Sequence, residues 1–151
     1  MILFTDGSCI GKEIKRAKWA VVIYDNNENE IDSFSEEIFD IVTNQRAELL
    51  ALKIAIEKAN NGDIIYSDSL YSIKCVKEWS SNWESNGWQT ANKKDVKHRD
   101  IIEPMIKEYK SKEIELVHMR GHQKGDSFII RGNNAADKLA TMFDKNDIKN
   151  L

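Results

Sequence analysis

Four acidic residues lie in short polar segments that border apolar runs. They are Asp6 in FTDGS (4–8), Glu48 in TNQRAELLAL (43–52), Asp68 in YSDS (66–69) and Asp137 in GNNAADKLA (132–140). A lone carboxylate is costly to bury, so it normally takes up a proton or finds a cation. Four carboxylates that converge on one point would need a multivalent metal, and Mg²⁺ suits carboxylate oxygens. These acids make the chain a candidate for metal-dependent phosphoryl chemistry.

Each acid also has a structural interpretation when it is taken alone. Asp6 with Gly7 would suit a simple turn, and Glu48 would suit the acidic half of a helix-capping box. Asp68 is a candidate helix N-cap, and Asp137 would complement a helix dipole. For any single acid, structural duty and catalysis are about equally supported.

Size and composition limit the class of protein. The chain has 151 residues, 41% apolar and 31% charged, which fits one domain over residues 1–151. It has no apolar run of about 18 residues and no signal-peptide pattern at its start, so we expect no membrane partner. The two cysteines, Cys9 and Cys75, have no metal-ligand spacing and fit a reducing compartment. A cytoplasmic location is expected.

The overall charge argues weakly against a nucleic acid partner. The net charge is −3 and the pI is near 5.7, whereas nucleic-acid binders are often basic. The local charge differs from the net charge, because basic residues cluster over 12–18 and again over 93–99. Lys110, Lys112 and Lys149 are interpreted as solvated surface charge.

Apolar periodicity predicts an α/β fold. Strands are expected at 1–6, 18–25, 30–39, 63–67 and 114–118, with a turn at 25–29. The i, i+3, i+4 spacing from Ala47 to Lys58 predicts a helix that Thr43 or Asn44 can cap. Further helices are expected at 69–78, 98–110 and 133–144.

This order predicts a mixed five-stranded sheet with helices on both faces. Three antiparallel strands come first, and the strand–helix–strand crossover then favours two parallel strands. Sites in such sheets form beyond the carboxyl ends of parallel strands. We expect Asp6 and Asp68 at strand ends, Glu48 in the first turn of the crossover helix and Asp137 near the first turn of the last helix.

The motifs around the acids, taken together, resemble those of type 1 ribonuclease H. TDGS, TNQRAELLAL, SDS and the pair RGHQ and GNNAADKLA follow the order of that family over nearly the whole chain. The stretch GWQTANKKDVKHRD (87–100) is similar to the basic protrusion of bacterial members. The resemblance implies a ribonuclease H-like fold and an endoribonuclease that cuts the RNA strand of an RNA–DNA hybrid, leaving 5′-phosphate and 3′-hydroxyl ends.

The resemblance also implies the roles of the acids. Two Mg²⁺ ions, with Mn²⁺ as a substitute, would activate water and stabilise the leaving oxygen. Asp6 would bridge both ions, Glu48 and Asp68 would serve mainly one, and Asp137 would serve the other. His122, between Gly121 and Gln123, is expected to shuttle a proton or assist product release.

Substrate contacts are expected from several other segments. RNA is distinguished from DNA by its 2′-hydroxyls in a shallow minor groove, and backbone groups near Gly7, Ser8 and Cys9, with Asn44 and Gln45, are the expected readers. Thr43 would bind a phosphate of the DNA strand. Trp79, Trp83 and Trp88 are either core aromatics or contacts with the hybrid, and at least one is expected to touch it. Lys93, Lys94 and Lys97 would hold phosphates, with solvated charge as the alternative.

Three segments depart from the family pattern. Residues 10–20 (IGKEIKRAKWA) lack the glycine- and proline-rich loop common after TDGSC, so minor-groove contacts there are expected to differ. Leu70 stands where many relatives carry glutamine. The stretch from His122 to Asp137 looks longer than the usual loop, which affects where His122 lies over the metals.

Other functions remain open at this point. Another nuclease of the same fold would keep the acids but not the basic protrusion. A non-catalytic hybrid-binding module would be favoured by a missing acid, and none is missing. A domain cut from a reverse transcriptase is a third alternative. Met1 and the complete protrusion favour a free-standing protein instead. We expect this protein to be a monomer.

Overall fold

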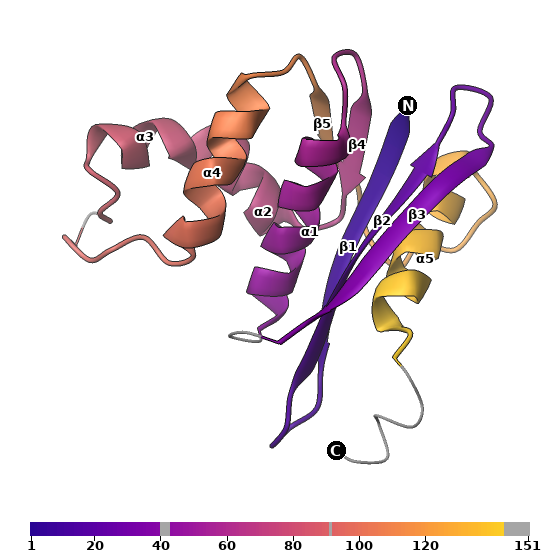
Figure 1. Ribbon diagram of the computed structural model, residues 1–151, viewed down its shortest axis with the longest axis horizontal. Helices are drawn as coiled ribbons and strands as arrows, with labels where there is room; N and C mark the ends of the chain where they lie inside the picture. Colours follow the sequence, from indigo (N-terminus) through magenta and orange to yellow (C-terminus); the bar gives the residue numbers. More distant parts are fainter. Residues whose placement is uncertain (40–42, 91, 144–151) are drawn as a thin grey trace.

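The computed structural model describes residues 1–39, 43–90 and 92–143, and they form one mixed sheet with helices on both sides (Figure 1). The strand order is β3-β2-β1-β4-β5; β1–β2 and β2–β3 are antiparallel, while β1–β4 and β4–β5 are parallel. The predicted fold class is therefore confirmed. The strands are β1 (Ile2–Ile10), β2 (Arg16–Tyr24), β3 (Glu30–Ile38), β4 (Ile64–Ser67) and β5 (Glu115–His118).

The first strand is longer than expected. It was predicted to end at residue 6, but β1 continues to Ile10. Its parallel pairing with β4 ends at Thr5 and Ser67, whereas its antiparallel pairing with β2 continues to Ile10 and Arg16. Asp6 therefore lies inside a strand, yet it is the first residue beyond the parallel part of the sheet.

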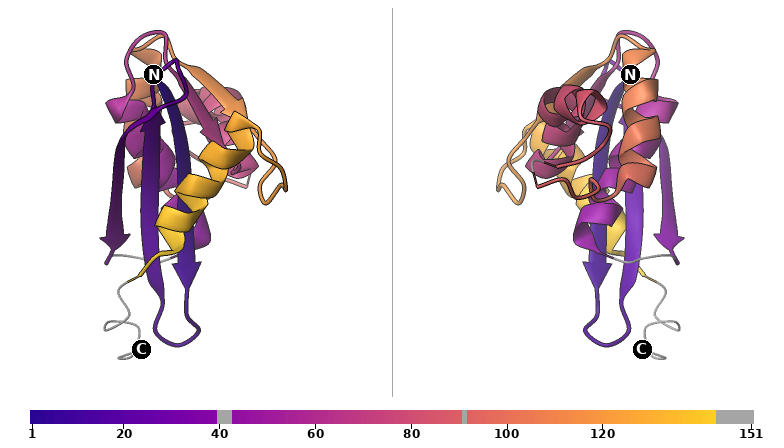
Figure 2. Two further views of the ribbon diagram at one scale, coloured as in Figure 1. Left: turned by 90° about the vertical axis from the view of Figure 1, so that its right-hand side faces the viewer. Right: turned by 90° about the vertical axis from the view of Figure 1, so that its left-hand side faces the viewer.

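Alternation along the strands divides the core between two sheet faces. On one face, Leu3, Val21 and Ile65 pack with α1 and α4. On the other, Phe4 and Val22 pack with α5. Figure 2 shows α5 alone on its side of the sheet, with α1 and α4 on the opposite side. The helices are α1 (Asn44–Lys58), α2 (Leu70–Lys74), the π-helical turn η1 (Cys75–Trp79), α3 (Ser80–Ser85), α4 (Arg99–Lys110) and α5 (Phe128–Thr141).

Two helices are longer than their predicted ranges. The helix expected at 69–78 continues through η1 and α3 to Ser85. The closing helix begins at Phe128 rather than at residue 133, with the Ser127 side chain as its N-cap. A glycine inside this helix obscured its start, because glycine is a poor helix former. The structure explains Gly132, since a Cβ there would lie 2.3 Å from the Phe4 ring.

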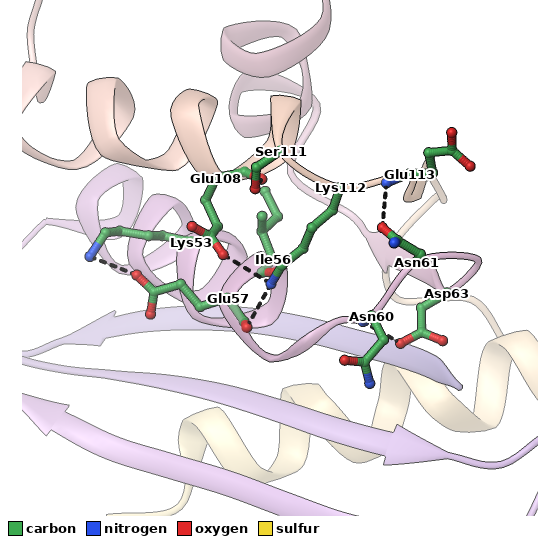
Figure 3. Close-up of polar contacts among 10 residues, drawn as sticks. All are labelled: Lys53, Ile56, Glu57, Asn60, Asn61, Asp63, Glu108, Ser111, Lys112 and Glu113. Atoms are coloured by element: carbon green, nitrogen blue, oxygen red, sulfur yellow. Dashed lines mark hydrogen bonds and ion pairs between the residues drawn. The ribbon is translucent and has the colours of Figure 1, made fainter.

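A group of polar contacts fixes the end of α1 that lies far from the acids (Figure 3). Lys112 Nζ donates to the carbonyl oxygens of Ile56 (3.0 Å) and Glu57 (2.9 Å), and it pairs with Glu108. These carbonyls have no partner inside the helix, so the lysine caps the C-terminus. The prediction that Lys112 is merely solvated is therefore wrong. Lys110 forms an exposed pair with Glu84, and Lys149 lies outside the described residues.

No helix among the described residues is long and apolar enough to cross a membrane.

Candidate active site

Asp6 and Glu48 are brought together by a close approach of β1 to α1. Gly7 makes this approach possible, because a Cβ there would lie 2.3 Å from the backbone carbon of Ala47. The backbone N–H of Gly7 donates to Glu48 Oε1 at 3.2 Å and holds that carboxylate beside the strand. Glu48 is the fifth residue of α1, so it lies in the second helical turn rather than the expected first.

Asp68 comes directly after the C-terminal end of β4, as predicted. The ligand oxygens of Asp6, Glu48 and Asp68 all lie within 4.8 Å of one another. Gly121 packs against Asp68, because a Cβ at Gly121 would lie 2.7 Å from Asp68 Oδ2. The topology thus gathers carboxylates from a strand, a helix and a strand end at a single point.

Asp137 reaches the same point from the other side of the sheet. It lies in the third turn of α5, not near the first turn as predicted, because the helix starts earlier. Asp137 hydrogen-bonds with Asp6 and raises the pKa of that group, and its charge also acts on Glu48 and Asp68. All four predicted acids therefore interact with one another.

The pKa values of Asp6, Glu48 and Asp68 are raised because charge is crowded in a buried space. Burial is the largest cause for Asp6; the hydrogen bond and charge of Glu48 follow, and together these effects raise its pKa to about 10. Burial raises the pKa of Glu48 to about 7, against an opposing hydrogen bond with Asp6. Burial also raises the pKa of Asp68, while the charge of His122 and a hydrogen bond with Asn133 lower it.

This donor set fits divalent metal ions. Among the described residues, none of the four carboxylates forms an ion pair with a lysine or arginine, and the positive charge that acts on Asp68 comes from His122 and His118. Hard oxygen donors in a cluster of this kind are the preferred ligands of Mg²⁺ and similar ions. A bound dication would favour the ionised carboxylates and reverse the upward pKa shifts.

His122 lies at the edge of the acid cluster. Its side chain is exposed, its backbone adopts φ = 54°, and its charge lowers the pKa of Asp68. A left-handed backbone at a non-glycine residue is uncommon and is often found at functional sites. Much of the supposedly long loop after His122 is the early part of α5, and the connecting segment ends at Ser127.

Sequence reasoning missed Asn133 and Gly121. Asn133 is only 3% exposed, lies on α5 and hydrogen-bonds with the Asp68 side chain. It precedes Asp137 by four residues and so shares its helix face. That spacing is the one signal in the sequence that could have identified Asn133. Nothing local marks Gly121, because its role depends on the tertiary contact with Asp68.

The expected minor-groove readers lie together at the N-terminus of α1. The backbone N–H of Cys9 donates to Asn44 Oδ1 at 2.9 Å, and Thr43 caps the helix by accepting from the N–H of Arg46. Asn44 and Gln45 are exposed. The Ser8 hydroxyl donates to the Ala140 carbonyl oxygen at 2.5 Å, so it is engaged with α5. Substrate contacts at these residues, Gly7 included, stay predictions.

The rings of the three tryptophans and Tyr71 form a row in which neighbouring rings are tilted against one another. Ring centroids are 5.8 Å apart for Tyr71–Trp79, 5.7 Å for Trp79–Trp83 and 6.2 Å for Trp83–Trp88. Trp88 is only 6% exposed and lies under Arg99, which favours the core alternative for it. Trp79 and Trp83 pack against the core but are half-buried, so contact with a hybrid stays a prediction for them.

The predicted basic protrusion is a loop between α3 and α4. Lys93, Lys94 and Lys97 are all exposed on it, which is compatible with phosphate binding and with solvated charge. Arg46 on α1 holds the end of this loop and the start of α4, since its guanidinium binds Asp100 at 3.0 and 2.6 Å and lies 3.1 Å from His98 Nδ1.

Comparison with known proteins agrees with this geometry. A family model described as RNase H matches residues 1–143. The ribonuclease H of Syntrophomonas wolfei is 34% identical over 155 residues, which cover 100% of this chain and 97% of that protein. The ribonuclease H of Dechloromonas aromatica is 35% identical over 138 residues, which cover 86% of this chain and 90% of that protein.

Solved structures give the same result for the fold. The solution structure of the PFV RNase H domain superposes with a TM-score of 0.81 at 28% identity, covering 93% of this chain and 91% of that chain. A foamy viral protease-reverse transcriptase in complex with RNA/DNA hybrid superposes with a TM-score of 0.76 at 28% identity. That match covers 93% of this chain and 19% of the viral chain.

Proposed function

Since this chain belongs to the ribonuclease H family of RNA–DNA hybrid endoribonucleases, we propose that it cuts the RNA strand with two Mg²⁺ ions at the Asp6 cluster. The observation that carries the proposal is the approach of the Asp6, Glu48 and Asp68 oxygens to within 4.8 Å of one another, with Asp137 beside them. Mn²⁺ is an alternative ion, because it accepts the same oxygen donors.

The four acids would bind the two metal ions unequally. Asp6 would contact both ions, Glu48 and Asp68 mainly one, and Asp137 the other. When bound, the ions supply activation of the attacking water and stabilisation of the leaving oxygen. The N–H of Gly7 fixes the orientation of Glu48, and Asn133 fixes Asp68, so both carboxylates are held before metal arrives.

His122 would move protons at the edge of the cluster. It is exposed and its charge acts on Asp68, so it would lie between solvent and a phosphate bound at the acids. From there, its imidazole would carry a proton to or from bulk water during turnover or product release. The products would carry 5′-phosphate and 3′-hydroxyl ends.

Recognition of the hybrid would follow from groups at the N-terminus of α1 and from the protrusion. Asn44, Gln45 and the backbone of residues 7–9 would read the 2′-hydroxyls of the RNA strand, while Thr43 would bind a phosphate of the DNA strand. Lys93, Lys94 and Lys97 would add affinity without sequence preference. The protein would act as a single-domain monomer in the cytoplasm.

The test is a cleavage assay on labelled RNA–DNA hybrid, double-stranded RNA and double-stranded DNA, with Mg²⁺, with Mn²⁺ and with excess chelator. Cleavage of only the RNA strand of the hybrid, and only with metal, is expected. Equal cutting of double-stranded DNA, or full activity in chelator, would contradict the proposal. Binding of the hybrid without cleavage would instead support the non-catalytic module, which the presence of all four acids disfavours.

A further inference from the structure

The β1–β2 hairpin projects beyond the rest of the molecule. The two strands remain paired from Asp6 and Ala20 to Ile10 and Arg16, after β4 has ended. Residues 11–15 form its tip, and all of them are exposed. Figures 1 and 2 show the hairpin extending past the N-terminal end of α1, away from the β2–β3 turn at the opposite end of the sheet.

The hairpin carries an excess of positive charge. Residues 10–18 contain Lys12, Lys15, Arg16 and Lys18 but only one acid, Glu13. Lys18 donates to the carbonyl oxygen of Met142. Lys12 and Lys15, by contrast, form no ion pair within the described part of the chain, so their charges face solvent. The β2–β3 turn at the far end is acidic, with residues Asp25, Glu28 and Glu30.

The base of the hairpin is anchored, which gives the tip a defined direction. The Arg16 guanidinium binds both carboxylate oxygens of Glu37 on β3, with Nη2 at 2.6 Å from Oε2, and it lies 5.0 Å from the centre of the Phe143 ring. At the tip, Gly11 adopts φ = +95°, and a Cβ there would lie 2.1 Å from the Ile14 carbonyl oxygen. A tight turn on an anchored base loses less entropy when it binds.

The tip lies next to the groups expected to bind the hybrid. Cys9, just before the tip, is hydrogen-bonded to Asn44 at the start of α1. Asp6 is on the same strand, and four residues of strand at about 3.3 Å each place Ile10 about 13 Å from it. Phosphates along one strand of a duplex advance about 3.4 Å each. Measured along the duplex axis, Ile10 is therefore about four nucleotides from the bond at the acids, and Lys12 and Lys15 lie beyond Ile10.

We infer that the tip of the β1–β2 hairpin is a second phosphate-binding arm, in which Lys12 and Lys15 hold backbone phosphates of the hybrid. The arm lies beyond the end of α1, on β-structure, whereas the protrusion follows α3 (Figure 1). This inference rests on the proposed function, and it concerns how far along the hybrid the protein reaches.

The test compares the parent with a Lys12→Ala/Lys15→Ala variant on hybrids shortened stepwise on either side of one cleavage site. On long hybrids, KM should rise roughly threefold to tenfold with kcat unchanged, and the slope of log affinity against log salt should fall by up to about 0.9 per lysine. On hybrids that end within about four nucleotides of the cut on one side, the variant should match the parent.

Two controls accompany this variant. Glu13→Gln removes the one acid of the tip and should lower KM, a change of opposite sign at the same place. Lys107→Ala/Lys110→Ala removes two exposed charges at the far end of α4 and should leave KM unchanged. Equal melting temperatures would show that all variants are folded.

These outcomes distinguish a failure of the hairpin inference from a failure of the proposed function. If the parent cuts hybrid but the hairpin variant behaves like it on every length, only the hairpin inference is overturned. The same holds if the loss is identical on the shortest hybrids, because the lysines would then act without touching distant phosphates. A parent that does not cut hybrid at all would overturn the proposed function itself.

Discussion

In the metal-free protein, Asp6 holds its proton to a higher pH than an ordinary carboxyl group does. It is only 4% exposed, and burial with the adjoining Glu48 raises its pKa to about 10. Unfolded, the same group loses its proton near its ordinary value of 3.8. A metal ion must therefore displace a proton when it binds, and its apparent affinity should rise with pH.

The first prediction concerns the stability of the metal-free protein. Between pH 4 and about 10 the unfolded state binds fewer protons at Asp6 than the folded state, so this group stabilises the fold at low pH and loses that effect as pH rises. Asp6→Asn should remove this loss, because the amide never ionises. Urea denaturation in chelator should show that the free energy of unfolding of the variant increases relative to that of the parent as pH rises. A parallel pH dependence in the two proteins would contradict the pKa shift.

The same substitution should have the opposite effect on catalysis. Asp6→Asn or Asp68→Asn removes one metal ligand, and turnover should fall by well over about 100-fold, since even groups that only support metal ligands contribute about 10- to 100-fold. Single-turnover cleavage at saturating metal measures this loss. Near-parental turnover in either variant would exclude that residue from the site.

His122→Ala should reduce turnover less than Asp6→Asn or Asp68→Asn does. The side chain supports proton movement but is not part of the carboxylate cluster, so turnover should fall by about 100-fold, at the lower end of general acid–base effects. Metal affinity, measured by calorimetry, should stay near the parental value. A drop in turnover equal to that of Asp6→Asn would mean that His122 has a more direct role.

At the scale of elements, the sequence indicated each strand and helix but not how long each one is. Alternation and i, i+4 spacing identify an element from its own residues. The start of α5 depends instead on Phe128 packing 5.5 Å from Phe4, and Gly132 is required by the same ring. The extension of β1 to Ile10 depends on its pairing with β2. Such features need tertiary contacts, which periodicity does not contain.

Gly7→Ala tests the element contact that joins Asp6 to Glu48. The added Cβ would meet backbone atoms of Ala47 and Glu48 at 2.3 to 2.5 Å, so α1 must move away from β1. Overpacking typically costs about 1–3 kcal/mol, and the upper end is expected because no flexible side chain can yield. Denaturant unfolding measures the loss, and metal affinity should fall with it. Cys9→Ala on the same strand is the control, with a change under about 0.5 kcal/mol.

At the scale of the whole molecule, net charge was a poor guide to a nucleic acid substrate. The total of −3 includes the four clustered acids, and it hides the separation of basic segments from the acidic β2–β3 turn. The four acids themselves could be identified from motifs, because their neighbours carry the pattern. For Asn133 the sequence offers only its four-residue spacing from Asp137, because its contact with Asp68 exists only after α5 has packed across the sheet.

The last prediction concerns the protrusion, where sequence and structure leave two interpretations open. Replacing Lys93, Lys94 and Lys97 by Ala should raise KM and leave kcat largely unchanged, because binding energy far from the metals is lost about equally from ground and transition states. The loop should keep its shape, because its backbone hydrogen bonds do not involve the lysine side chains. The N–H of Lys93 donates to the carbonyl oxygen of Thr90 (2.9 Å), and the N–H of Thr90 donates to the carbonyl oxygen of Lys94 (2.7 Å).

The salt dependence of binding distinguishes phosphate contacts from general surface charge. Each phosphate contact that is lost should lower the slope of log affinity against log salt by up to about 0.9. The triple variant removes up to three such contacts. Lys107→Ala/Lys110→Ala is the reference for charge alone, because both lysines lie at the end of α4 away from the loop. If both variants show the same slope per charge removed, residues 93–97 are ordinary surface. The hybrid would then be held by the metal site and by the groups at the N-terminus of α1, with the β1–β2 hairpin as the remaining basic arm.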